Sequence, residues 1–166
     1  MKTLLVLRHA KSSWKRRDTS DHDRPLNKRG KRDAPRMGRL LAERRLRPDL
    51  IISSTARRAR LTADEVAKHA GYTGTVQLER RLYLASPTEI IDVVREAAGT
   101  ARRVMVVGHN PGLEDLVARL TAPGEALPTA ALAEIRLSIR VWRNLTLSSS
   151  GRLAGLWRPR ELADDV

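Results

Sequence analysis

Apolar residues along this chain occur in short runs that are separated by longer amphipathic stretches. The strands predicted over residues 3–7 and 103–108 lack polar alternation, which is typical of central strands covered on both faces of a sheet. Residues 132–138 alternate between apolar and charged positions, which predicts a half-buried antiparallel or edge strand. Further strands are predicted over residues 48–54, 75–78 and 153–157. Strands that alternate with helices favour an α/β fold, a three-layer α/β/α sandwich whose central sheet is mostly parallel with one antiparallel edge strand.

Helix start signals follow several of these strands. Asn27 is placed to cap a long helix, and because Pro35 lies inside it we expect a kink or a restart with Asp33 capping the second piece. Thr55 is expected to cap the next helix. Residues 86–89, Ser-Pro-Thr-Glu, have the form of a capped helix start with proline in the first turn.

Length and composition narrow the class of protein. The 166 residues predict a single domain over residues 1–158, followed by a C-terminal tail over residues 159–166. The absence of cysteine excludes disulfides, thiolate metal ligands and cysteine nucleophiles. No apolar run approaches the length of a membrane span and the N-terminus lacks the features of a secretory signal. We therefore expect a cytoplasmic protein with no membrane partner.

The net charge of +13 is distributed unevenly along the chain. Residues 8–60 carry 18 Lys and Arg against 6 Asp and Glu, so nearly all of the excess lies in one third of the sequence. Such a field attracts anionic substrates and polyanions. No nucleic-acid-binding module is recognisable and aromatic residues are only 3% of the chain, so no specific nucleic acid is expected as a partner.

Basic and titratable residues follow three of the predicted strands. Arg8 and His9 end the first, residues 54–59 follow the second, and His109 ends the strand over residues 103–108. The carboxyl ends of parallel strands meet at one edge of a sheet, where α/β proteins place their ligand site. Two of these segments also enter helices, whose N-termini bind anions. Two arginines and two histidines around that point describe a phosphoryl pocket.

The motifs of this chain resemble those of the histidine phosphatase superfamily, which has the phosphoglycerate-mutase-like fold. The resemblance is strongest to its small phosphohistidine phosphatase branch, known as SixA. The family's Arg-His-Gly motif stands here as Arg8-His9-Ala10, with alanine in place of glycine. Its Ser-Pro-x-x-Arg-Ala-x-x-Thr motif stands as residues 54–62, with threonine in place of proline at position 55. This alignment makes Arg58 the phosphate-binding arginine, and not its neighbour at position 57.

Two further motifs extend the resemblance over almost the whole chain. Residues 108–111, Gly-His-Asn-Pro, match the second-histidine motif of the branch. Residues 23–26, Asp-Arg-Pro-Leu, are followed by Gly30 and match its loop signature. They lie in the segment 11–26, which is too long for a tight connection and indicates a functional loop.

The resemblance implies a role for each of these residues. His9 is expected to be the nucleophile, whose ring nitrogen attacks phosphorus to form a transient phosphohistidine that water then hydrolyses. Arg8 and Arg58 are expected to bind the equatorial phosphoryl oxygens, and His109 to donate to the same oxygens. Further phosphate contacts are expected from Arg24 and Asn110. No metal or other cofactor is expected, because arginines supply the charge that Mg²⁺ supplies elsewhere.

The glutamate that larger members of the superfamily use as general acid has no clear counterpart in this chain. The corresponding region, residues 79–84, has no carboxylate at the aligned positions. Asp18, Asp21 or Asp23 could substitute, and the sequence does not choose among them. The run of residues 21–23, Asp-His-Asp, also suggests a metal site, but three consecutive loop residues are more typical of a solvated loop.

The substrate expected from the resemblance is phosphohistidine on a protein, and the basic charge favours an acidic phosphoprotein. We expect the enzyme to act as a monomer. Two alternatives stay open at this stage. One is a phosphatase of a small-molecule phosphoester, and the other is a non-catalytic protein that binds polyanions or phosphorylated ligands.

Overall fold

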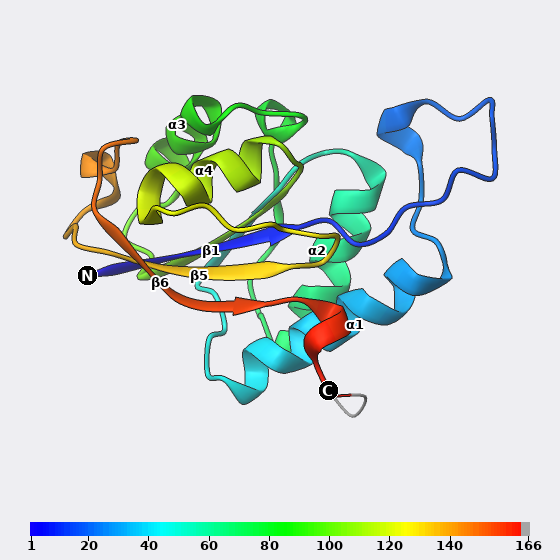
Figure 1. Ribbon diagram of the computed structural model, residues 1–166, viewed down its shortest axis with the longest axis horizontal. Coiled ribbons are helices and arrows are strands. Elements are labelled where there is room, and N and C mark those ends of the chain that lie inside the picture. The colour runs from blue at the N-terminus through cyan, green and yellow to red at the C-terminus, as the bar shows by residue number, and fades with distance from the viewer. Residues whose placement is uncertain (164–166) are drawn as a thin grey trace.

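In the computed structural model, which describes residues 1–163, a six-stranded sheet lies between two layers of helices (Figure 1). The strands are β1 Lys2–Arg8, β2 Leu50–Ser53, β3 Gln77–Leu78, β4 Arg103–Gly108, β5 Leu132–Leu137 and β6 Gly151–Trp157. The α-helices are α1 Lys28–Glu43, α2 Arg57–Ala70, α3 Pro87–Ala97 and α4 Gly112–Thr121. Short 3₁₀ helices are η1 Asp21–Asp23, η2 Arg80–Leu82, η3 Trp142–Asn144 and η4 Pro159–Glu161. The predicted three-layer α/β fold is confirmed.

The strand order in the sheet is β3-β2-β4-β1-β5-β6. The first four strands of this order pair in parallel, whereas β5 is antiparallel to both β1 and β6. The strand that runs against the others is therefore interior, and the expectation that it forms the edge is wrong. On β5, which pairs with β6 along its outer side, Glu134 is only 4% exposed and its carboxylate forms an ion pair with Arg136. The alternating pattern predicted a half-buried strand because a sequence pattern does not show that β6 lies beside β5.

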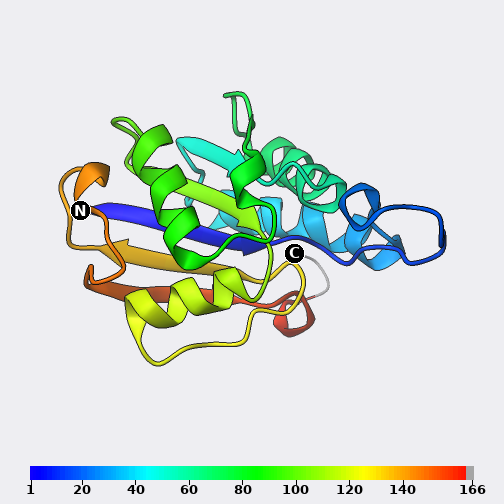
Figure 2. The same ribbon diagram turned by 90° about the horizontal axis from the view of Figure 1, so that it is seen from above.

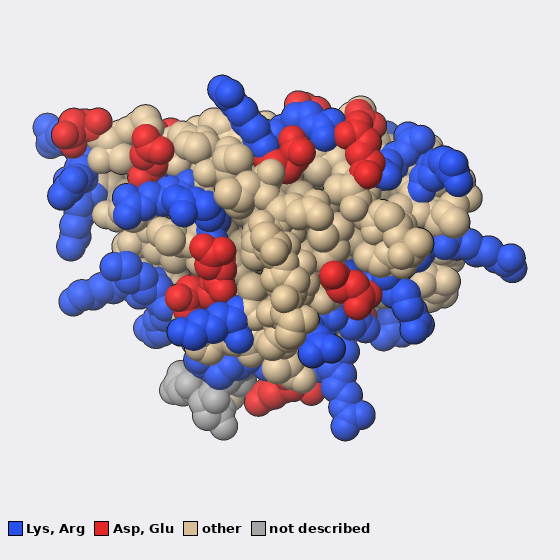
Figure 3. Space-filling view, turned by 180° about the vertical axis from the view of Figure 1, so that it is seen from behind, with Lys and Arg blue, Asp and Glu red and all other residues tan. Residues whose placement is uncertain are grey.

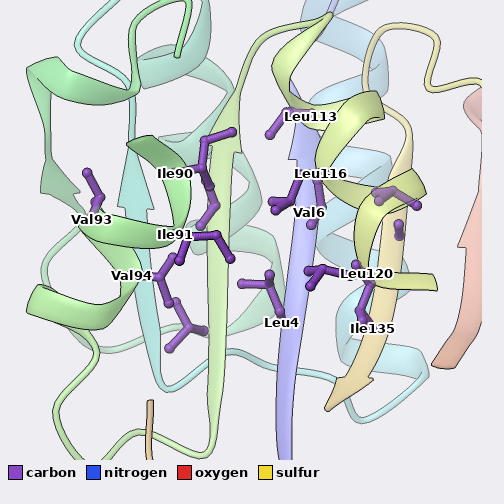
Figure 4. Packing of buried hydrophobic residues seen from close by; sticks show 14 of the residues in the cluster. Leu4, Val6, Ile90, Ile91, Val93, Val94, Leu113, Leu116, Leu120 and Ile135 are labelled. Atoms are coloured by element: carbon purple, nitrogen blue, oxygen red, sulfur yellow. The ribbon is translucent and has the colours of Figure 1, made fainter. Parts of the chain in front are cut away.

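Strand β1 contributes to both hydrophobic layers because successive side chains point to opposite faces. Leu4 and Val6 lie in the core under α3 and α4 (Figure 4). Leu5 and Leu7 lie in the core that α1 and α2 cover on the other face. A strand buried on both faces has no position for a polar residue, which explains the apolar runs of β1 and β4.

The long helix α1 continues through Pro35, so the alternative of a restart is wrong, whereas the kink stays a prediction. Asn27 caps the helix as predicted, with its side chain accepting from Gly30 N. Asp33 does not cap a second piece but lies buried inside the helix and pairs with arginines on the same helix. The helix packs closely on α2, where Gly38 leaves no room for a side chain against Val66.

The other two predicted caps have different outcomes. The capping box at Ser86 is confirmed, because Ser86 Oγ accepts from Glu89 N and Glu89 Oε1 accepts from Ser86 N. Thr55 does not cap α2. Ala56 is the N-cap residue, and its amide donates to Ser54 Oγ at 3.1 Å. The sequence could not distinguish these neighbouring hydroxyls, since both lie just before the helix.

The loop of residues 11–26 projects beyond the carboxyl end of β1 (Figures 1 and 2). At the other end of the chain, η4 keeps Pro159 buried, and Ala163 O accepts from Arg36 Nη2 at 3.2 Å. Residues 159–163 of the expected tail therefore lie against α1, and residues 164–166 fall outside the described residues. Within residues 1–163 no helix combines the length and apolar character needed to cross a membrane.

Candidate active site

The carboxyl ends of β1, β2 and β4 meet at one edge of the sheet. Arg8 lies opposite Gly108 in the register of β1 and β4, and His9 N donates to Gly108 O at 3.0 Å. On the other side of β4, Ser54 N donates to Val107 O at 2.9 Å. These bonds bring together the three segments that the sequence singled out.

His9 is 7% exposed, and its hydrogen bonds define which ring nitrogen carries the proton. Nδ1 lies 2.8 Å from Ala10 O. Because a carbonyl oxygen can only accept, Nδ1 carries the hydrogen and Nε2 keeps its lone pair. That nitrogen lies 3.4 Å from Nε of Arg58, which donates to it. His9 therefore presents an unprotonated Nε2 to a guanidinium group.

Thr62 fixes the backbone on which His9 stands. Its buried Oγ1 accepts from Ala10 N at 2.9 Å and donates to Arg58 O at 2.7 Å. One hydroxyl thus ties the end of β1 to the first turn of α2. The threonine of the family motif thus connects the backbone at Ala10 to the backbone at Arg58. Its position in the sequence does not predict this role.

Arg58 lies at the centre of the site and is only 3% exposed. Its Nη2 is 3.4 Å from His109 Nδ1 and 3.1 Å from Asp21 Oδ2, and its Nη1 donates to Asp21 O at 2.6 Å. The neighbouring Arg57 is exposed to solvent. Arg58, the arginine expected from the motif, is therefore the one of the two that contacts both His9 and His109.

His109 is buried beside His9, with 5.2 Å between the two ring centroids. Its Nδ1 accepts from Arg58, so its Nε2 carries the hydrogen and donates to Ser54 Oγ at 2.8 Å. Burial, followed by the positive charge of His9 and of the arginines, lowers the pKa of His109 to about 3. The ring is therefore neutral at physiological pH.

The pKa of His9 is also lowered, to about 4. Burial is the largest cause, and the positive charges of three arginines add to it, Arg58, Arg8 and Arg24. A nucleophilic histidine must be unprotonated. The surroundings that can bind a phosphoryl group thus also keep the His9 ring in its reactive form.

Arg8 and Arg24 both lie close enough to His9 for their charges to lower its pKa. Arg8 Nη1 donates to Leu127 O at 3.1 Å, and its buried Nε has no hydrogen-bond partner within the described chain. Arg24 is buried and donates to Asp21 Oδ1 and to Ser12 Oγ. The free Nε of Arg8 is a donor available to a ligand oxygen.

Asp21 is the one aspartate of the three acid candidates that contacts these groups. Its carboxylate accepts from Arg58, Arg24 and the phenolic hydroxyl of Tyr83. Burial opposes the shift, but these hydrogen bonds together hold the pKa of Asp21 well below its usual range. Asp18 is exposed, and Asp23 bonds to Ser20 and His22 within the loop.

Tyr83 was not singled out by the sequence, although it completes the rim of the site. Its ring stands edge-on to His109 at 5.5 Å and to His22 at 4.9 Å. His22 Nε2 in turn lies 2.9 Å from Thr55 Oγ1. An aromatic residue after a short strand carries no local signal of such a role, because the contact depends on how loop 11–26 folds back.

The side chain of Asn110 bonds to neighbouring parts of the chain. Its Nδ2 donates to Glu114 Oε1 at 2.9 Å and to Leu127 O at 2.8 Å. Glu114 Oε1 also accepts from Leu127 N. Both amide hydrogens of Asn110 are thus used to hold segment 123–128, whose Leu127 contacts Arg8.

Among residues 1–163 no group of three or more His, Cys, Asp and Glu is arranged to hold a metal ion.

Comparison with known proteins agrees with this geometry. The chain matches the family described as the histidine phosphatase superfamily (branch 1) over residues 4–83. It is 30% identical over 161 residues to the uncharacterized protein ML1117 of Mycobacterium leprae, and the alignment covers 89% of this chain and 97% of that protein.

Solved structures extend the likeness to the whole fold. A protein of Agrobacterium tumefaciens assigned as the phosphohistidine phosphatase SixA is 29% identical with a TM-score of 0.81, over 95% of this chain and 98% of that one. A protein of Nakamurella multipartitia with the same assignment is 26% identical with a TM-score of 0.81, over 95% and 96% of the two chains. This chain belongs to the histidine phosphatase superfamily, among its SixA-type members.

Proposed function

We propose that the protein is a phosphatase that removes the phosphoryl group from phosphohistidine on a protein, through a covalent phosphohistidine on His9. The observation that carries this proposal is the state of His9. Its Nδ1–H donates to Ala10 O, and the lone pair of its Nε2 faces the guanidinium group of Arg58. Membership of the histidine phosphatase superfamily supports phosphatase activity.

The first step forms a bond between His9 Nε2 and phosphorus while the bond from phosphorus to the substrate nitrogen breaks. Arg8 and Arg58 bind the phosphoryl oxygens, where the negative charge spreads in the transition state. Arg58 exchanges its bonds to Asp21 and His9 for bonds to these oxygens. The incoming negative charge also raises the pKa of His109, and a proton taken up from solvent at its Nδ1 lets that N–H donate to the phosphoryl oxygens.

In the second step a water molecule attacks phosphorus and the bond to His9 Nε2 breaks. Phosphate leaves with the oxygen of that water, and His9 returns to its neutral form with Nδ1 still bonded to Ala10 O. The backbone anchor at Thr62 holds the ring in one orientation through both steps.

The state of Asp21 favours phosphohistidine over a phosphoester as substrate. An alkoxide leaving group needs a proton from a general acid, and the lowered pKa of Asp21 leaves its carboxylate ionised at neutral pH. Imidazole leaves as a neutral ring when its other nitrogen is protonated, so it needs no such acid. The names of the relatives in Agrobacterium tumefaciens and Nakamurella multipartitia agree with this substrate class.

The test compares turnover of three substrates at equal concentration: a phosphohistidine protein, a small phosphoramidate and a small phosphoester. We expect hydrolysis of both phosphorus–nitrogen substrates, much slower hydrolysis of the ester, and no effect of a chelator. His9→Asn should abolish turnover, while His69→Asn, a histidine of α2 that bonds to Glu65, should not. Faster hydrolysis of the ester than of both phosphorus–nitrogen substrates contradicts the proposal.

A further inference from the structure

Beside the phosphoryl site lies a cavity of about 340 Å³ that the proposed reaction does not use. Its lining residues are Ser13, Lys15, Arg16, Thr19, Pro25 and Arg57. The cations Lys15, Arg16 and Arg57 are all exposed, and no carboxylate is among the lining residues. The cavity is therefore strongly positive.

These three cations differ from the arginines of the phosphoryl site in having no anionic partner. Arg24 and Arg58 share the carboxylate of Asp21. For the side chains of Lys15, Arg16 and Arg57, by contrast, residues 1–163 supply no ion pair or hydrogen bond. The charge of Arg57 lowers the pKa of Asp23 slightly, but the carboxylate of Asp23 pairs with His22 and not with Arg57. Figure 3 shows that Lys and Arg border much of the face drawn there, so exposed cations alone do not define a site.

The position of the cavity links it to the phosphoryl site. Arg57 directly precedes Arg58 in the first turn of α2, so one of these neighbours is exposed beside the cavity and the other is buried against His9. Pro25 directly follows Arg24, and Thr19 precedes Asp21 by two residues. Three residues of the cavity lining are thus near neighbours along the chain of Arg24, Asp21 and Arg58 of the phosphoryl site.

Trp14 indicates what kind of ligand this is. It lies between Ser13 and Lys15 of the cavity, is 71% exposed, and has its ring 3.5 Å from the guanidinium carbon of Arg24. A tryptophan held in place by a cation yet left largely in solvent is typical of an anchor for a protein surface. A small phosphorylated metabolite would leave this ring uncovered.

We propose that Trp14, Lys15, Arg16 and Arg57 form a docking surface, here called the basic rim, for an acidic segment that flanks the phosphohistidine of a protein substrate. This inference rests on the proposed function and assigns its substrate class more narrowly. The three cations bind the Asp and Glu side chains of that segment, and Trp14 packs against its backbone and apolar atoms. Since the contacts are exposed, they weaken as salt screens them.

The test uses two phosphohistidine peptides that differ only in whether acidic or uncharged residues flank the phosphohistidine, with a small phosphoramidate as third substrate. We expect wild type to show a kcat/KM roughly tenfold higher for the acidic peptide at low salt. The triple variant Lys15→Ser, Arg16→Ser, Arg57→Ser should lose this preference and keep its phosphoramidate activity. Equal kcat/KM for both peptides in wild type overturns the inference.

A control with the same change of charge separates the basic rim from the net charge of the protein. Lys68, Arg140 and Arg152 are exposed on other parts of the chain, and replacing all three with Ser should leave the preference intact. An equal loss of preference in this control contradicts a local docking surface.

Binding measurements make the inference testable even if the proposed reaction fails. Fluorescence polarisation follows the acidic peptide when it carries a stable phosphohistidine analogue, with no turnover required. Tighter binding by wild type than by the triple variant supports the basic rim whatever the catalytic result, and equal binding overturns it. Emission from Trp14 should shift on binding, and Trp14→Phe should remove that shift.

Discussion

The state of His9 leads to a prediction about how stability depends on pH. Its pKa is about 4 in the folded protein, against 6.5 in the unfolded chain. Between these values the unfolded state binds a proton that the folded state does not. The free energy of unfolding therefore falls as the pH falls from about 6.5 to about 4. From pH 7 to pH 5 the contribution of His9 to this loss is on the order of 2 kcal/mol.

His9→Asn removes this contribution while leaving the other titrating groups in place. Urea unfolding of wild type and variant at pH 7 and at pH 5 gives four free energies of unfolding. We expect wild type to lose about 2 kcal/mol more than the variant between these pH values. His69→Asn serves as the control, since this histidine lies on α2 away from the pocket and makes its bond to Glu65 O.

An equal loss of stability in wild type and His9→Asn would refute the reasoning, because it would mean that His9 protonates with an ordinary pKa. The same pKa governs the reaction. Since only the neutral ring is a nucleophile, kcat/KM should stay level as the pH falls from 7 to 5 and decline as it approaches about 4.

Three further variants test the contacts around His9. Arg58→Lys keeps the charge but loses the fork that reaches both histidines, and kcat/KM should fall about 10²-fold or more with folding intact by circular dichroism. Thr62→Val leaves the buried amide of Ala10 without an acceptor, so urea unfolding should show a loss of about 1–3 kcal/mol; a loss near zero would contradict that role. Asp21→Asn removes the carboxylate that competes for Arg58, so calorimetry should find inorganic phosphate bound several-fold more tightly, whereas weaker binding would show that Asp21 positions the arginines.

The core strands and the main ligand groups of the site could be predicted because their signals are local. An uninterrupted apolar run requires cover on both faces, and this holds for β1 and β4. The polar residue after each such run then falls at the shared edge of the sheet. For this reason Arg8, His9 and His109 were expected together, while Arg58 was expected from the resemblance to the family motif, and the structure brings the four together.

Other features depend on tertiary contacts that a sequence pattern does not record. The helix α1 continues through Pro35 and packs closely on α2 at Gly38, and Glu134 is buried on a strand whose outer side pairs with β6. Asp21 and Tyr83 meet only because loop 11–26 folds back over the pocket. The loop signature drew attention to the right segment, but the partner of each polar side chain in it could not be read from spacing.

The central claim is that His9 carries the phosphoryl group during turnover. The most direct measurement mixes the enzyme with a phosphoramidate labelled on phosphorus, quenches it in alkali, where phosphohistidine survives, and locates the label by peptide mapping. We predict acid-labile label on His9 within the first turnover, and none in His9→Asn. Label on another residue, or full turnover by His9→Asn, would contradict the account.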